Sequence, residues 1–417
     1  MPVSANASAV TLAADGDQNN EPARRHGARV LATMSLLLGF ASLSTDVFLP
    51  AMPAMARSLG ASAGAIEWTV SSYLVGFSLG QLLWGPIGDR AGRRLPIAIG
   101  LVLFVLGSAG CALAENSWQV IAARVLQAIG ASAGVVLSRA MVRDLYTGNR
   151  SAQMMSTLMM VMTLAPLLGP LLGAQILALA GWRAIFAALV CIGVLTLGAL
   201  WTLPETLIQE NRNREPLSWA FRDFGQILQN RRFLAYAGVS GGIYAGTFAY
   251  IAGSSFAFID YFDVSPQAYG YFFAAGVVGM MAANMVNARL VMSFGSDKLL
   301  LGGGILAAFS GIAAVVFTRW HLLGLAGMAV PLFGFIAATG FIVANSISGA
   351  LADHPGRAGA VSALLGAAQY GSGMIGSAIV GAMADGTPMP LTTTIAAAGV
   401  CSLVCAVFRC TSGAVRT

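Results

Sequence analysis

The sequence predicts an all-α membrane protein whose twelve transmembrane helices form two halves of six. Its composition is 57% hydrophobic and only 10% charged, whereas soluble domains are about 25% charged. Runs without a charged residue recur along the whole chain, and each reaches the roughly 20 residues with which a helix crosses a bilayer. A charged stretch near the middle, 204–232, separates the twelve expected helices into two sets of six.

Ten of the expected helices correspond to charge-free runs. In chain order these runs are 68–88, 95–114, 151–182, 184–204, 233–259, 264–288, 299–318, 320–352, 358–384 and 386–408. Two similar stretches, 30–56 and 116–142, contain a charge within the segment or near its end. The expected organisation is a tail at 1–28, an N-terminal half at 29–203, a linker at 204–232, a C-terminal half at 233–410 and a tail at 411–417.

The first tail is polar and lacks a basic start followed by an apolar segment, so it does not have the pattern of a cleavable signal peptide. We expect it to be disordered and cytoplasmic. With the N-terminus inside, nineteen basic residues fall on the cytoplasmic side and three, Arg57, Arg183 and Arg319, fall outside. Because basic residues accumulate in cytoplasmic loops, both termini are expected to face the cytoplasm. This bias, with a contribution from anionic lipid, accounts for the net charge of +6 without any nucleic acid.

Several other classes of protein do not fit the sequence. The only lysine, Lys298, is not part of a G-x-x-x-x-G-K-S/T loop, which argues against an ATP-driven pump. The histidines lie near the ends of expected spans and form no ligand cluster, so we expect no metal and no other cofactor. A membrane enzyme or receptor would need further acid–base groups at membrane depth, and the sequence offers no second deeply placed carboxylate.

The short segment GPIGDRAGRR, 85–94, joins the second and third expected helices. Its glycines permit a tight turn with positive φ, and Asp89 can accept from backbone N–H groups or pair with Arg93. A generic basic loop is the simpler interpretation. However, the segment resembles the signature of the major facilitator superfamily nearly position for position. The matching residues are Gly85, Gly88, Asp89, Arg90, Gly92, Arg93 and Arg94.

Other segments resemble one branch of that superfamily, the Bcr/CflA family of drug–proton antiporters. They are STDVFLPAMP (44–53), RVLQAIGASAG (124–134), RAMVRDLY (139–146), APLLGPLLGA (165–174) and GWRAIF (181–186). Phe48 stands where the family often has Tyr, and Ala128 and Ala174 replace glycines, which affects the expected local helix packing. The resemblance implies a major facilitator fold with a central cavity, and export driven by the proton gradient.

The segment 165–174 also has a physical interpretation of its own. Gly169 and Gly173 form a small-xxx-small ridge that allows another helix to approach closely. Pro166 and Pro170 remove backbone donors and bend the helix. A purely structural kink and a role in alternating access both fit this pattern.

Asp46 is the only acidic residue expected deep in a span, where a carboxylate costs about 3 kcal/mol on insertion scales. Arg124 is the only arginine in a similar position. At 1.5 Å per residue, Asp46 lies roughly 24 Å from the cytoplasmic end of its helix, and Arg124 about 9 Å from the outer end of its own. Both therefore fall in the outer half of the membrane, on helices that the resemblance places beside the cavity.

We therefore predict that Asp46 carries the coupling proton and that Arg124 tunes it. Burial favours the neutral form of a carboxyl group and a nearby guanidinium favours the charged form, so a change in their separation would move a proton. The alternative is a static ion pair that fixes the first helix to the fourth. That the coupling ion is a proton follows from the resemblance alone.

Substrate contacts are expected from aromatic and amide side chains. The second helix offers Tyr73, Phe77, Gln81 and Trp84 at helical spacing, although an aromatic stripe can equally face lipid or pack internally. The second half offers Tyr244, Phe248, Asn284, Asn287, Asn345 and Tyr370. Buried amides are costly unless paired, which favours the asparagines.

A gate is expected at the cytoplasmic side. By the resemblance, Asp89 would dock at the start of the eleventh helix, near 357–361, when that side is closed. A carboxylate is favourable at a helix N-terminus, which supports this placement.

The first functional hypothesis is a proton-coupled exporter of small amphipathic drugs of bicyclomycin, phenicol or sulfonamide type. The alternative is a major facilitator transporter of a small metabolite, although uptake of polar substrates usually needs more charged groups in the cavity. The expected partners are the drug or metabolite, protons and membrane lipid, with no nucleic acid. We expect a monomer in the bacterial inner membrane.

Overall fold

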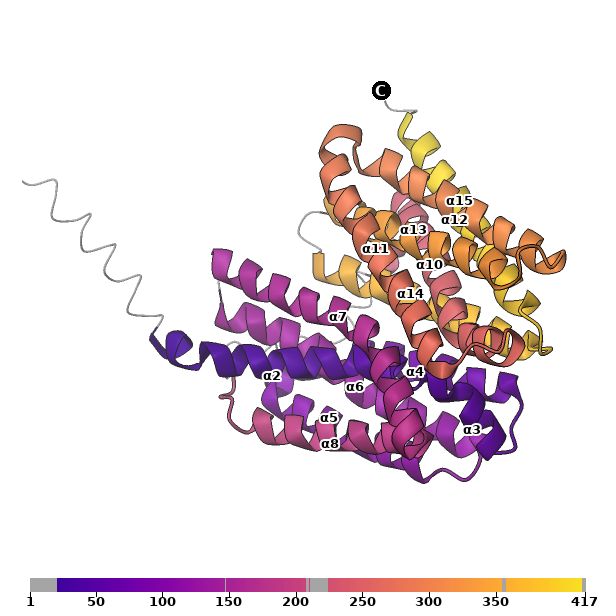
Figure 1. Ribbon diagram of the computed structural model, residues 1–417. Helices are drawn as coiled ribbons and strands as arrows, with labels where there is room; N and C mark the ends of the chain where they lie inside the picture. Colours follow the sequence, from indigo (N-terminus) through magenta and orange to yellow (C-terminus); the bar gives the residue numbers. More distant parts are fainter. Residues whose placement is uncertain (1–20, 147, 208–209, 211–223, 355–357, 415–417) are drawn as a thin grey trace, which may run out of the picture.

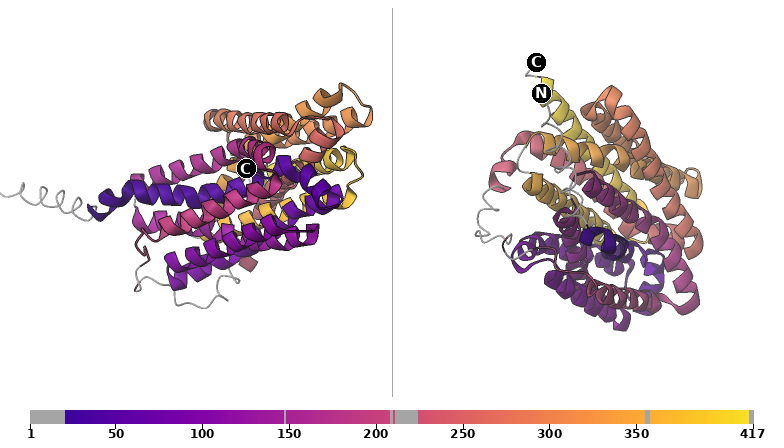
Figure 2. Two further views of the ribbon diagram at one scale, coloured as in Figure 1. Left: turned by 60° about the horizontal axis from the view of Figure 1, so that its bottom comes forward. Right: turned by 90° about the vertical axis from the view of Figure 1, so that its left-hand side faces the viewer.

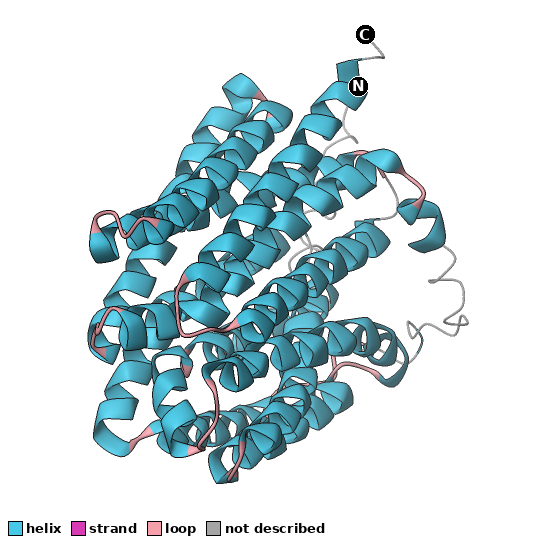
Figure 3. Cartoon of the chain, turned by 90° about the vertical axis from the view of Figure 1, so that its right-hand side faces the viewer, coloured by secondary structure: helices cyan, strands magenta, loops and turns pink. Residues whose placement is uncertain are grey.

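The structure, a computed structural model, describes residues 21–146, 148–207, 210, 224–354 and 358–414. Within them every regular element is a helix (Figure 3). The N-terminal half comprises α2 (Glu21–Asp46), η1 (Leu49–Ala51), α3 (Met52–Ser58), α4 (Ala63–Ala91), α5 (Arg94–Leu113), α6 (Ser117–Leu145), α7 (Gly148–Ala180) and α8 (Trp182–Leu200). The C-terminal half comprises α10 (Arg231–Ser255), the π-helical η3 (Phe256–Tyr261), α11 (Pro266–Phe294), α12 (Ser296–Arg319), α13 (Gly324–Ala352), α14 (Ala358–Met383) and α15 (Met389–Ala414). The predicted all-α membrane fold is confirmed.

Eleven of the described segments are long and apolar enough to cross a membrane, with Val30–Ser58 counted as one. α4 is not among them, although its 29 residues make it as long as its neighbours. Its mean hydropathy is lowered by polar side chains such as Glu67 and Ser71, which are buried between helices. α4 packs between α6 of its own half and α14 of the other, and it completes the twelve predicted helices.

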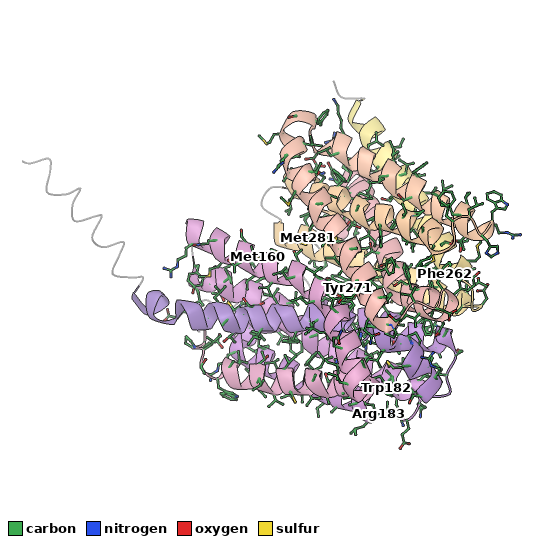
Figure 4. The ribbon with its side chains drawn as sticks, in the orientation of Figure 1. Met160, Trp182, Arg183, Phe262, Tyr271 and Met281 are labelled. Carbon is green, nitrogen blue, oxygen red and sulfur yellow. The ribbon has the colours of Figure 1, made fainter. Side chains whose placement is uncertain are left out.

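The two halves lie side by side, as the right-hand view of Figure 2 shows. Successive helices run in opposite directions, so their connections collect at two ends of the molecule (Figure 1). The end that carries the start of α2 and the α4–α5 turn is called here the arginine-rich end. The end that carries the α3–α4, α7–α8 and α14–α15 connections is called the arginine-poor end. Trp182, Arg183 and Phe262, labelled in Figure 4, lie at the arginine-poor end.

The halves repeat one backbone feature at the arginine-rich end. Gly92 ends α4 with a φ of 89°, and Gly295 ends α11 with a φ of 80°. These residues occupy the same place in their halves, directly after the second membrane helix. A side chain at either position would be strained, because only glycine adopts these angles readily.

The first predicted span is not one continuous helix. α2 ends at Asp46, and the chain continues through the 3₁₀ turn η1 into the short α3. Pro50 and Pro53 have no N–H group, so the carbonyls of Asp46 and Leu49 lose their helical donors. The break therefore places Asp46 at a helix C-terminus instead of in the middle of a helix.

The predicted boundaries at the tails and linker are only partly described. α2 begins at Glu21, within the tail predicted to be disordered over 1–28. Residues 1–20 lie outside the described part of the chain, as do 208–209 and 211–223 of the linker 204–232 and residues 415–417 of the second tail.

The halves touch closely at the arginine-poor end. Gly64 of α4 lies so near the Gly381 carbonyl of α14 that a β-carbon on Gly64 would overlap it. One to two turns further along these helices, the hydroxyls of Ser71 and Ser377 are 2.8 Å apart. The ion pair between Arg57 of α3 and Asp260 of η3 also joins the halves at this end. The two halves are therefore closed against each other at the arginine-poor end.

Candidate transport site

Arg124 of α6 is fully buried beside the end of α2. Its Nη1 donates to the Ser44 carbonyl at 2.9 Å and to Gln127 Oε1 at 2.6 Å. Ser44 lies in the last turn of α2, where carbonyl groups lack helical partners and a cation is favourable. Arg124 thus caps the broken first helix from across the N-terminal half.

Two aromatic rings enclose the same guanidinium. Its carbon lies 4.3 Å from the ring centre of Phe48 and 4.2 Å from that of Tyr73, within the range of a cation–π interaction. The Tyr73 hydroxyl is 2.7 Å from Ser44 Oγ. Arg124 therefore joins α2, α4 and α6 at one point, and a phenyl ring at position 48 is sufficient for this stacking.

Asp46 is also buried, with 4% of its surface exposed. Its Oδ1 accepts no hydrogen bond from the described residues, and neither Nε nor Nη2 of Arg124 has a partner among them. No ion pair joins the two side chains within the described structure, although they are near enough to interact electrostatically. This conformation therefore does not contain the static ion pair that the sequence left open as an alternative.

The segment 165–174 of α7 packs against this break. A β-carbon on Gly169 would lie 3.1 Å from Asp46 Cβ, and one on Gly173 would overlap the Val47 carbonyl. Pro166 and Pro170 lie inside the same helix. The small-residue ridge thus receives the end of α2, and it positions Asp46 through backbone contact.

Five of the aromatic candidates form a cluster that crosses between the halves. The ring centres of Tyr73 and Phe77 on α4 are 6.0 Å apart, and the ring centre of Phe77 lies 5.0 Å from that of Tyr370 on α14. The ring centre of Tyr370 in turn lies 5.9 Å from that of Tyr244 and 6.1 Å from that of Phe248, both on α10. Because Tyr73 also covers Arg124, ring contacts lead without interruption from the charged site to the other half. We call these five residues the aromatic cluster.

The remaining candidates on α4 behave differently from each other. Gln81 faces α14, since a β-carbon on Gly366 would lie 3.7 Å from its Oε1. Trp84 donates its indole N–H to the Ile129 carbonyl at 2.7 Å. Gln81 therefore lies between the halves, whereas Trp84 packs within the N-terminal half.

The asparagine candidates do not join the aromatic cluster. Asn345 donates to Asn287 Oδ1 at 2.7 Å and to the Phe341 carbonyl at 2.8 Å, while Asn284 is exposed on α11. The hydrogen bond between the two amides joins α11 to α13. The preference for asparagines as substrate contacts stays a prediction.

The structure gives two charged residues surroundings that the sequence did not predict. Arg139 lies in α6 near its arginine-rich end, where it donates to Met162 Sδ at 3.3 Å and interacts electrostatically with Tyr244 and Tyr370. Glu67 lies in the second turn of α4, near the end of that span, and only 3% of its surface is exposed. Asp46 is thus not the only buried carboxylate. The helical register of Glu67 with Ser71, four residues later, is the signal that could have revealed it.

The signature segment organises the arginine-rich end of the N-terminal half. Gly85, Asp89 and Arg90 belong to α4, so the connection itself is short. Arg93 Nη1 donates to Asp89 at 2.6 Å, and its Nε donates to Asp144 of α6 at 2.9 Å. These pairs tie α4, α5 and α6 together within one half.

Glu205 extends this cluster to the end of the N-terminal half. It accepts from the backbone N–H of Arg93 at 2.7 Å and of Arg94 at 3.1 Å. Partial burial disfavours its charged form, but these and two further backbone hydrogen bonds outweigh burial and hold the pKa of Glu205 below its usual range. Glu205 thereby supplies the anion favoured at the start of α5.

The expected docking of Asp89 at the eleventh helix is not seen. Its carboxylate pairs with Arg93, and residues 355–357 lie outside the described part of the chain. The docking was expected for a state closed at this end, so it stays a prediction.

Nothing in the described residues resembles a metal centre: they contain no group of three or more His, Cys, Asp or Glu side chains that could hold an ion. The arrangement offers instead a buried carboxyl group, a capped and stacked guanidinium, and a cluster of aromatic rings shared by the two halves.

Comparisons with known proteins agree with this geometry. Residues 34–254 match the family model of the Major Facilitator Superfamily. An uncharacterized MFS-type transporter of Bacillus subtilis is 36% identical over 84% of this chain and 88% of its own. A chloramphenicol resistance protein of Pseudomonas aeruginosa is 32% identical over 86% of each chain. A bicyclomycin resistance protein homolog of Haemophilus influenzae is 29% identical over 90% of this chain and 94% of its own.

Solved structures share the fold. The xylose transporter XylE of E. coli, in a partially occluded inward-open conformation, superimposes with a TM-score of 0.69 over 92% of this chain and 97% of its own. Its sequence is 17% identical, so this similarity concerns the architecture alone.

Proposed function

Because the chain belongs to the major facilitator superfamily, and within it to the Bcr/CflA transporters, we propose that it is a proton-coupled multidrug efflux transporter. The protein is a transporter and not an enzyme. Its proposed substrates are small amphipathic compounds of bicyclomycin, phenicol or sulfonamide type. It uses no cofactor and is driven by the proton gradient.

The observation that carries this proposal is the aromatic cluster beside Asp46. Rings from both halves provide a surface for flat apolar molecules of varied shape, and the hydroxyls of Tyr244 and Tyr370 can hydrogen-bond polar substituents. Arg139 adds a positive charge at its edge. A substrate held between halves is released to alternate sides as the halves rock, which is how alternating access works in such folds.

Asp46 is proposed to bind the coupling proton. It lies at a helix break, and its interaction with Arg124 is electrostatic without being a formed ion pair. Movement of α2 against α6 would bring the charges together or apart, which favours the carboxylate or the neutral acid in turn. Electrostatic interaction with Tyr370 connects Asp46 to the substrate surface.

The proposed location is the bacterial inner membrane, with the arginine-rich end in the cytoplasm. Most basic residues of the chain then satisfy the positive-inside rule. The state described here would accept substrate from the cytoplasm, because its closed end is the arginine-poor one. We propose that the protein acts as a monomer in contact with lipid.

The test compares the wild type with Asp46→Asn at matched membrane levels, in a bacterium that lacks its own efflux pumps. Growth inhibition is measured against phenicols, bicyclomycin, sulfonamides and lipophilic cations. Asp263→Asn is the matched control, because Asp263 is exposed and its φ of 54° suits asparagine. We expect protection by the wild type and the control, and none by Asp46→Asn.

Other outcomes have defined meanings. Equal protection by Asp46→Asn would show that Asp46 does not carry the coupling proton. If the wild type protects against no compound, transport of a small metabolite becomes the better explanation.

A further inference from the structure

Glu67 is a second buried carboxylate, and the transport site described above does not use it. It lies in the second turn of α4 at the arginine-poor end. Only 3% of its surface is exposed, and Oε2 is buried without a hydrogen-bond partner among the described residues. A charge buried in this way is unfavourable unless it is paired.

Glu67 faces a small pocket that both halves build. The pocket has a volume of about 80 Å³, and its walls include Ala63 and Glu67 of α4, Val380 of α14, and Thr387 and Leu391 beside the start of α15. This is room enough for ordered water. Because the walls come from both halves, the pocket exists only while the arginine-poor end is closed.

The charges around the pocket do not compensate Glu67. Asp260 of η3 is the other ionisable residue in its lining, and it is paired with Arg57 at 3.0 Å. Asp385, next to the lining, is exposed and accepts from the Thr387 hydroxyl at 2.7 Å. No basic side chain lines the pocket, and Arg57 is occupied by Asp260, so a negative charge on Glu67 would have no cation of its own.

The contacts that close this end also bury Glu67. A β-carbon on Gly381 would lie 3.4 Å from Glu67 Cβ, and Gly64, one turn earlier on α4, touches the same backbone. When α4 and α14 separate, the Glu67 carboxyl group becomes hydrated. When they meet, it is enclosed with no partner.

We propose that Glu67 is a second proton-binding site, loaded from the arginine-poor side, and that this end closes only when Glu67 is protonated. A proton from water binds the hydrated carboxylate in the open state and is returned to water when the end reopens. The inference rests on the proton coupling of the proposed function, but not on its drug substrates.

The test measures the opening of this end directly, without substrate. Spin labels are placed at Ser58→Cys on α3 and Ala382→Cys on α14, both exposed, in a variant without the five native cysteines. The distance between the two spin labels is measured in lipid nanodiscs by double electron–electron resonance spectroscopy. The pH is varied from roughly 5 to 9, a range in which buried carboxyl groups can titrate. We expect the short distance to dominate at low pH and the long distance to grow as pH rises.

Three variants decide the interpretation. Glu67→Gln, a neutral mimic of the protonated acid, is expected to keep the short distance over the whole range. Glu67→Asp, which retains a titratable group, should keep a pH-dependent distance. Glu115→Gln removes an exposed carboxylate at the same end and should behave as the wild type.

The inference fails if Glu67→Gln titrates like the wild type, or if the wild-type distance does not depend on pH. A wild type that titrates as expected but exports no drug would overturn the drug substrates alone, so the two proposals fail separately.

Discussion

Arg124 shows how a buried charge can be held mainly by uncharged neighbours. Its Nη1 donates to the Ser44 carbonyl and to the side-chain amide of Gln127. The guanidinium also lies against the aromatic rings of Phe48 and Tyr73. The amide of Gln127 is in turn oriented by a hydrogen bond of 2.7 Å that its Nε2 donates to Ser108 Oγ. This environment keeps the guanidinium in place whether or not Asp46 is charged, which a coupling site requires.

We expect Arg124→Lys to lower transport at least tenfold, because an ammonium group cannot stack between two rings while also reaching both acceptors. Loss of a charged buried hydrogen bond costs about 1.5–3 kcal/mol, so thermal stability should fall as well. Uptake of substrate into inverted vesicles and the melting temperature of purified protein measure the two effects. Arg319→Lys, at an exposed position, serves as the control, and normal transport by Arg124→Lys would contradict the prediction.

The aromatic cluster makes a second prediction at this scale. Tyr370→Ala removes three ring contacts, each worth about 0.5–1.5 kcal/mol beyond area burial. We expect the substrate concentration for half-maximal transport to rise about tenfold, in line with 1.4 kcal/mol per factor of ten. Tyr370→Phe keeps the ring and should retain most of the affinity for apolar compounds. Unchanged affinity of Tyr370→Ala for every compound tested would remove the cluster from the substrate site.

At the scale of helices, the decisive contact is the one between α7 and the broken end of α2. Glycines on α7 accept the backbone at Asp46 and Val47 so closely that side chains would not fit. The labelled Met160 of α7 and Met281 of α11 in Figure 4 mark two neighbouring helices of opposite halves. α7 therefore touches both Asp46 and the C-terminal half.

Gly173→Ala is expected to destabilise the protein by about 1–3 kcal/mol, because its β-carbon would overlap the Val47 carbonyl and force α2 and α7 apart. Thermal unfolding of purified protein measures this change. Gly198→Ala is the matched control: Gly198 lies in α8 with nothing within 4 Å of the added atom, so stability should be unchanged or slightly higher. Equal stability of both variants would show that α2 and α7 can separate without cost.

At the scale of the whole molecule, closure of the arginine-poor end rests on close packing more than on charge. The Arg57–Asp260 pair that crosses it is 67% and 43% exposed, and such surface pairs contribute about 0–1 kcal/mol. The contact between Gly64 and Gly381 brings two backbones together and leaves no room for a side chain.

Gly64→Val should therefore hold this end open and abolish transport while the protein remains in the membrane. Arg57→Gln should retain most of its transport. Transport assays, together with the label distance between positions 58 and 382, distinguish these outcomes. If Arg57→Gln lowered transport more than Gly64→Val, charge and not close packing would be the main contribution to closure of this end.

Much of this architecture could be predicted from local features of the chain. Charge-free runs identify the membrane helices, because an unpaired charge in a bilayer is costly at any position. Gly92 in the signature segment predicts a turn, because glycine adopts its positive φ readily without help from distant residues. The two prolines after Asp46 also carry a local signal, and the helix break there was missed because the hydrophobic run continues through it.

The sequence by itself determined which segments are helices, where they turn and which charged residues are unusual, since these depend on neighbours along the chain. Only the tertiary structure decided that Arg124 caps α2 instead of pairing with Asp46, that Asn345 donates to Asn287, and that Glu67 is enclosed by the opposite half. Each of these outcomes depends on which residue, distant in sequence, lies opposite in space. Burial and pairing are properties of such contacts, so residue type and spacing could not predict them.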